Sequence, residues 1–346
     1  MEIVSRIAKL TAAPGVSGME EAVAQEIMAQ FKACTPDVWQ DVPGSVYARL
    51  GRGRPVVLIA AHMDEIGMLV TAIEENGMLR VCKIAGVDPR ILPGARVLVH
   101  TAGGPLPAVM GALPPHLQTG KPKAYAWEDI LCDTGLPAPE ARRLVSVGDA
   151  ITLYPDAPLR LLNERIAGKT LDDRAPLAAL AQLAEALCAV ELPCTAVLCA
   201  TVQEERSGAG ALAAGWGAGA DMAIALDVTH APPPEEKFRT FPLEAPVLTR
   251  GGSIHPRLFA VLAKAAASAG IPYATEACMT ASGTDAWDIY TRRAGIPTAL
   301  ISVPLRYMHT GVELISLPTL CQTVRLLTEF LLHMPANWED ELCLPG

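Results

Sequence analysis

Four runs of apolar residues form the main hydrophobic pattern of the chain. They occupy residues 55–61, 195–202, 220–228 and 296–303, and few polar side chains interrupt them. Strands that are apolar on both faces are typical of a parallel sheet covered on both sides. We therefore predict that these four runs form strands that are buried on both faces.

Helical patterns lie before, between and after these runs. In residues 20–31 the apolar side chains recur on one helical face, and Ser17 followed by Glu20 predicts a capping box at the start of this helix. Buried strands that alternate with helices predict an α/β fold with helices on both faces of the sheet. The same helical periodicity recurs at residues 173–190, 256–269 and 317–332.

Residues 68–165 interrupt this alternation. This stretch of 98 residues contains 11 of the 29 prolines, and its apolar pieces, such as 96–99 and 149–153, are short. Long helices are hard to place among so many prolines. We predict a small β-rich domain here, inserted into an α/β domain that is formed by residues 1–67 and 166–346.

Composition and charge narrow the class of protein. Of the 346 residues 51% are hydrophobic, which excludes general disorder, and the formal net charge of −9 disfavours nucleic acid as a partner. The first residues do not resemble a secretory signal, and the longest stretch without charged residues, 97–120, contains too many prolines for a membrane helix. Nine cysteines without a CxxC pair are typical of a reducing compartment. We predict a cytoplasmic protein with no membrane partner.

Acidic residues and histidines gather where the apolar runs end. The ligand crevice of an open α/β sheet lies beyond the carboxyl ends of its strands, so these side chains are expected to meet there. Each of these residues taken singly has an ordinary structural explanation, such as helix capping by an aspartate. For the site to be absent, however, such an explanation would have to hold for all five clusters at once. The candidates are His62, Asp64, Glu65, Glu204, Glu205, Asp227 and His309, with Asp172 and Asp173 just before a predicted helix.

These residue types suit a metal centre. Imidazole nitrogens and carboxylate oxygens, without a thiolate among them, favour zinc, cobalt or manganese. Two ions about 3.5–4 Å apart need one carboxylate that bridges them and one or two further ligands each. Two histidines and three carboxylates meet that requirement, and one further carboxylate remains to act as a base.

The polar clusters also form a recognisable series of motifs. AAHMDEIGM, LDDR, VQEE, ALDVT, SGTDA and RYMHT, in this order, resemble the tetrahedral aminopeptidase family. These are dinuclear metallopeptidases that include glutamyl and deblocking aminopeptidases, and some members are labelled endoglucanases. The resemblance implies a zinc-peptidase-like α/β/α sandwich, a mostly β inserted domain that serves dimerisation, and a homo-oligomer, typically a tetrahedral dodecamer built from dimers.

The resemblance also implies a role for each candidate residue. Glu204 matches the general base, and Asp64 matches the carboxylate that orients a histidine ligand. The choice of Asp172 over Asp173 as the bridging ligand comes only from the family pattern. The implied ligands of the two divalent ions are His62, Asp172, Glu205, Asp227 and His309.

The predicted function is hydrolysis of the N-terminal peptide bond of peptides. A metal-dependent deacylase of small amides is an alternative with the same metals, and a metal-free glycosidase or a catalytically inactive scaffold fits the residues less well. The sequence does not determine which N-terminal residue of the substrate is preferred. Arg250 and Arg306 are close to the motifs in sequence and could line an acid-specific pocket or form ordinary ion pairs.

Overall fold

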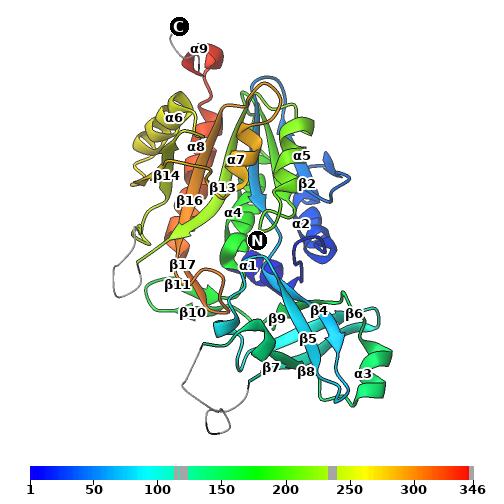
Figure 1. Cartoon of the computed structure of the whole chain (residues 1–346). Helices are drawn as coiled ribbons and strands as arrows, with labels where there is room; N and C mark the ends of the chain where they lie inside the picture. The colour runs from blue at the N-terminus through cyan, green and yellow to red at the C-terminus, as the bar shows by residue number, and fades with distance from the viewer. Residues whose placement is uncertain (113–115, 117–123, 233–239, 343–346) are drawn as a thin grey trace.

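The computed structural model of the chain describes residues 1–112, 116, 124–232 and 240–342. Figure 1 shows a large α/β part with a smaller β-rich part beside it. Some residues of the predicted insert, 113–115 and 117–123, lie outside the described residues. Among the described residues no helix combines the length and the apolar character that crossing a bilayer requires.

An eight-stranded sheet forms the centre of the large part. Its strand order is β1-β2-β12-β3-β13-β16-β14-β15, and β12, β3, β13 and β16 run parallel to one another. All four predicted apolar runs are therefore adjacent strands of this sheet. The strands are β1 (Val38–Gln40), β2 (Val46–Gly51), β3 (Val56–His62), β12 (Thr195–Thr201), β13 (Met222–His230), β14 (Val247–Gly251), β15 (Ala274–Cys278) and β16 (Thr298–Leu305).

Helices cover both faces of this sheet because its central strands are apolar on both sides. In β3, Val57, Ile59 and Ala61 pack into one core cluster with α1, α2, α4, α6 and α8. Leu58 and Ala60 point the other way, into a cluster with α5 and α7. The predicted α/β sandwich is confirmed. The helices are α1 (Ile3–Ala12), α2 (Glu21–Lys32), α4 (Leu171–Leu187), α5 (Ala209–Gly217), α6 (Pro256–Ser268), α7 (Asp285–Tyr290), α8 (Leu317–Leu332) and α9 (Trp338–Leu342).

The predicted capping box before α2 is wrong. Glu20, and not Ser17, occupies the N-cap position of this helix, and its side chain makes no capping hydrogen bond. The Ser17 hydroxyl instead donates to Oδ2 of Asp64 at 2.6 Å. Because Asp64 is fully buried and charged groups need partners in the interior, this distant contact takes the place of the local one.

The β-rich part is a closed six-stranded barrel with strand order β4-β5-β8-β7-β6-β9. Its interior is filled by side chains such as Met68, Leu79, Val99 and Ile151, which form a core separate from that of the large part. One seven-residue helix, α3 (Ala138–Leu144), lies beside it in Figure 1. The strands are β4 (Gly67–Ile73), β5 (Leu79–Ile84), β6 (Arg96–Thr101), β7 (Gly104–Gly111), β8 (Leu131–Asp133) and β9 (Ala150–Leu153).

A second, three-stranded sheet follows the barrel in sequence. Strands β10 (Leu159–Leu161) and β11 (Arg165–Gly168) form an antiparallel pair, and β11 also pairs with β17 (Glu313–Ser316) from the far end of the chain. Residues 159–165 thus contact strands of the large part. The division into domains at 67/68 and 165/166 stays a prediction.

Candidate active site

The site lies where the parallel strands β12, β3, β13 and β16 end. His62 is the last residue of β3, and Glu204 and Glu205 lie on the turn that follows β12. Asp227 is within β13, opposite Ser302 of β16, and His309 follows the end of β16. The ends of neighbouring parallel strands therefore bring together residues that are far apart in sequence.

Asp172 and Asp173 reach the site from the start of α4. Both residues have non-helical backbone angles, so the regular helix begins after them and Pro176 falls in its first turn. A proline at this point costs no helix hydrogen bond. This local geometry leaves the side chains of both aspartates at the end of the helix that faces the sheet.

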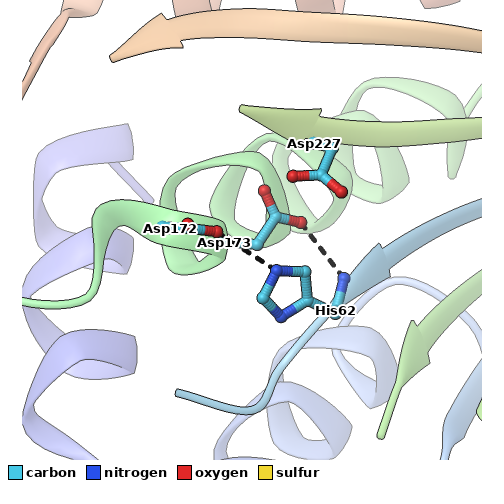
Figure 2. Close-up of side chains that lie close together, drawn as sticks. All are labelled: His62, Asp172, Asp173 and Asp227. Atoms are coloured by element: carbon cyan, nitrogen blue, oxygen red, sulfur yellow. Dashed lines mark hydrogen bonds and ion pairs between the residues drawn. The ribbon is translucent and has the colours of Figure 1, made fainter. Parts of the chain in front are cut away.

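One candidate metal-binding cluster consists of His62, Asp172, Asp173 and Asp227 (Figure 2). One ligand atom from each of these four buried residues lies within 4.8 Å of the others. Nε2 of His62 is 3.2 Å from Oδ1 of Asp172, and the backbone N–H of His62 donates to Oδ2 of Asp173 at 3.1 Å. The other oxygen of Asp173, Oδ1, is buried and has no hydrogen-bond partner among the described residues.

A second candidate cluster consists of Asp172, Glu205 and His309. Nε2 of His309 is 3.3 Å from Oδ2 of Asp172 and 3.0 Å from Oε1 of Glu205. Asp172 thus belongs to both clusters, with one oxygen facing each histidine. Gly86, which follows β5 of the barrel, lies so close to the His309 ring that a Cβ there would be 2.2 Å from Nδ1.

Asp64 connects the histidine to the two glutamates. Its Oδ1 is 3.3 Å from Nδ1 of His62, on the side of the ring that faces away from Asp172. The same carboxylate accepts hydrogen bonds from the backbone N–H groups of Glu204 at 3.0 Å and Glu205 at 3.2 Å. Asp64 therefore holds both the imidazole and the glutamate turn in place. Burial opposes ionisation of Asp64, but these partners outweigh it and lower its pKa.

The buried acids and histidines of the site shift one another's pKa values. Burial raises the pKa of Glu204 to about 10 and also raises the pKa of Glu205 and Asp227. Burial alone would lower the pKa of His309, but its hydrogen bonds to Asp172 and Glu205 raise it to about 11. A raised pKa means that an acid or a histidine binds its proton more tightly, so both kinds of residue in this site favour bound positive charge.

Divalent cations fit this donor set. They would supply the positive charge that the buried carboxylates require, and the unpartnered Oδ1 of Asp173 shows that the hydrogen bonds of the cluster are incomplete. Nitrogen and oxygen donors without a thiolate match the predicted zinc, cobalt or manganese. The five predicted ligands His62, Asp172, Glu205, Asp227 and His309 all lie in one or other cluster.

Some residues of the site were not predicted from the sequence. The carboxylate of Glu313 accepts hydrogen bonds from the backbone N–H groups of Asp172 at 3.0 Å and His309 at 2.8 Å, so it holds two predicted ligands in position. Its signal is an acidic residue within the apolar stretch VELIS. Glu20 similarly accepts from the backbone N–H of Gln203, next to Glu204.

A cavity of about 260 Å³ opens onto the clusters. It is lined by His62, Asp172, Glu204, Glu205, Asp227 and His309 and extends toward β14 and β15. Among the described residues no lysine or arginine lines it. Arg250, one of the two arginines considered for an acid-specific pocket, lies over the ring of Phe259, and Arg306 is also outside the lining.

Known proteins are similar to this chain in both sequence and fold. A family model described as M42 glutamyl aminopeptidase matches residues 44–326. A lysyl aminopeptidase of Pyrococcus furiosus is 34% identical over 92% of this chain and 93% of its own length. A TET aminopeptidase from a marine Thaumarchaeota archaeon has a TM-score of 0.92 at 28% identity, over 99% of each chain. The TET1 peptidase of Pyrococcus horikoshii, described as able to assemble into a tetrahedron or a large octahedral shell, has a TM-score of 0.86 at 30% identity, over 96% of this chain and 100% of its own.

The α/β sandwich, the inserted barrel and the candidate metal site thus define an enzyme of the metalloaminopeptidase class, a hydrolase that acts on peptides. The chain belongs to the M42 glutamyl aminopeptidase family. The predicted resemblance to the tetrahedral aminopeptidases is confirmed.

Proposed function

We propose that the chain is a dinuclear metal-dependent aminopeptidase that removes N-terminal residues from peptides. The observation that carries this proposal is the position of Asp172, which faces His62 with one oxygen and His309 with the other. A carboxylate shared by two ligand clusters is what a pair of neighbouring metal ions requires. His62 and Asp227 would complete one metal site, and His309 and Glu205 the other.

Two bound divalent ions would polarise the scissile carbonyl and lower the pKa of a water molecule. Glu204 takes the proton of that water and later delivers it to the leaving amine. Its Oε2 is 3.9 Å from Nε2 of His62, and Glu204 belongs to neither ligand cluster, which favours a base over a ligand. The backbone carbonyl of Asp64 can accept from Nδ1 of His62 at 3.2 Å, with the carboxylate 3.3 Å away, and this leaves Nε2 available for a metal.

The free amino group of the peptide would bind a metal or a carboxylate of the site, which limits cleavage to the first residue. A metal-dependent deacylase of small amides would use the same residues, and a panel of aminoacyl and N-acyl substrates separates the two activities. A metal-free glycosidase has no use for histidines among its carboxylates.

Metal content tests the proposed centre. We expect about two divalent ions per chain by elemental analysis, because Asp172 connects two separate clusters. His62→Ala and His309→Ala should each lose one ion, since each histidine contacts only one side of Asp172. Chelation should abolish peptidase activity, and zinc, cobalt or manganese should restore it. A protein without bound metal that stays fully active in chelator would refute the proposal.

We also propose that the chain assembles into a homo-oligomer, with a tetrahedral dodecamer of dimers as the favoured form. Twelve chains of 36.5 kDa would give about 440 kDa, which light scattering can measure. Residues 68–165 should carry contacts between subunits, since the barrel supplies none of the proposed ligands. Hydrogen exchange should therefore slow in this region when dilute samples are concentrated. A concentration-independent monomer would contradict this expectation.

A further inference from the structure

The cavity of the proposed active site continues beyond the metal ligands, and this extension has its own charged group. Glu276 of β15 lines it, together with Thr229 of β13 and Thr249 of β14. Thr249 and Glu276 are paired in register on neighbouring parallel strands. The hydroxyl of Thr229 donates to Oε2 of Glu276 at 3.4 Å. One side of the cavity is thus built from three strands and ends at a carboxylate.

The hydroxyl of Thr249 is a second polar group in this extension. Thr249 is 1% exposed, and its hydroxyl has no hydrogen-bond partner among the described residues. A buried hydroxyl usually finds a partner in the protein or in ordered solvent. Thr249 borders the cavity beside Glu276, so the wall next to this carboxylate is polar.

No lysine or arginine among the described residues that line the cavity offsets the negative charge of Glu276. Asp172, Glu204, Glu205 and Asp227 belong to the proposed metal centre, where two divalent ions would offset four negative charges. Within the described part of the chain, Glu276 is the remaining carboxylate of the lining, and no lysine or arginine accompanies it there. This extension therefore favours a cation and disfavours an anion.

Strand β13 connects the proposed metal centre to Glu276 along one side of the cavity. Asp227 and Thr229 lie two residues apart on β13, about 6.6 Å along a strand, and both line the cavity. The Thr229 hydroxyl then reaches Glu276. A lysine carries its ammonium on a four-carbon stem, and the apolar side chains of Leu300 and Met308 line the same cavity.

We propose that Glu276 selects peptides whose first residue is lysine or arginine. This inference rests on the proposed aminopeptidase function and adds the substrate class to it. With the scissile bond at the proposed metal centre, the first side chain extends along β13, its stem packs against Leu300 and Met308, and its charged head meets Glu276. An acidic first residue would meet like charge.

Kinetics with aminoacyl-nitroanilides test this inference. The enzyme with its metals restored should have a higher kcat/KM for the lysyl and arginyl substrates than for the leucyl substrate, and the lowest for the glutamyl one. Glu276→Gln keeps the size of the side chain but removes the charge. We expect it to lower the lysyl-to-leucyl ratio of kcat/KM by about 10–100-fold, mainly through KM. Glu276→Lys should reverse the order of the lysyl and glutamyl substrates.

The control is Glu191→Gln, an exposed residue before β12, at the opposite end of the strand from the site. It loses the same charge and should leave the ratio unchanged. An unchanged ratio in Glu276→Gln would overturn the inference. An equal loss on all substrates would also overturn it, because Glu276 would then bind the amino terminus that all of them share. A wild-type enzyme that cleaves the leucyl substrate without preferring lysine refutes only this inference, whereas no cleavage of any substrate refutes the proposed function as well.

Discussion

Glu204→Gln should lower turnover by about 10²–10⁴-fold while both metal ions stay bound, as expected for the loss of a general base. Glutamine keeps the size and part of the hydrogen bonding of the side chain, but it cannot take a proton. Peptide binding should persist, because the proposed ligands on both sides of Asp172 are untouched. Elemental analysis and substrate kinetics on the same preparation measure the two properties together.

The adjacent glutamate provides the matched comparison. Glu205 lies 3.0 Å from Nε2 of His309 and belongs to a ligand cluster, so Glu205→Gln should weaken one metal site. Excess metal should then partly restore activity, which it cannot do for Glu204→Gln. The assignment fails if Glu204→Gln loses metal while Glu205→Gln remains fully loaded and inactive.

Asp172→Asn should remove activity almost completely, because it changes the one carboxylate that faces both histidines. We expect both ions to bind more weakly and kcat/KM to fall by about 10³-fold or more, since metal ions supply several kcal/mol of stabilisation to the transition state. Elemental analysis after dialysis and activity measurements over a range of metal concentrations measure this effect.

Asp173→Asn is the control for this experiment. Asp173 belongs only to the His62 cluster, and an asparagine oxygen can still accept the hydrogen bond from the backbone of His62. At most one ion should be affected. If Asp173→Asn lost both ions while Asp172→Asn retained two, the shared ligand would be Asp173 and the assignment to Asp172 would be wrong.

The central part of the fold was predictable because a strand that is buried on both faces consists almost entirely of apolar residues, and such a run is visible in the sequence. β3, β12, β13 and β16 are apolar on both faces, so each appears as an uninterrupted run. Their carboxyl ends then indicate where His62, Glu205 and His309 meet. By contrast, β15 lies at the edge of the sheet with alternating exposed positions, and no apolar run predicts it.

The parts that the sequence did not predict depend on contacts between distant segments. Ser17 suits a local helix cap, but the fold places it beside Asp64, 47 residues away. Glu313 holds the backbone of Asp172 from 141 residues away, and no spacing rule connects the two. Glu276 reaches the cavity only because β15 is placed next to β14. Such pairings follow from the arrangement of the strands in space and leave no local pattern.

The position of β16 has a consequence for the synthesis of the chain. This strand lies between β13 and β14 in the sheet, although it is made after both of them. Until it leaves the ribosome, β14 and β15 have no strand that joins them to the rest of the sheet, and His309 has not yet been made. Domains form as their segments emerge. The proposed centre therefore lacks a ligand until residue 309 has been added, so a shorter growing polypeptide should have no peptidase activity toward the proteins made around it.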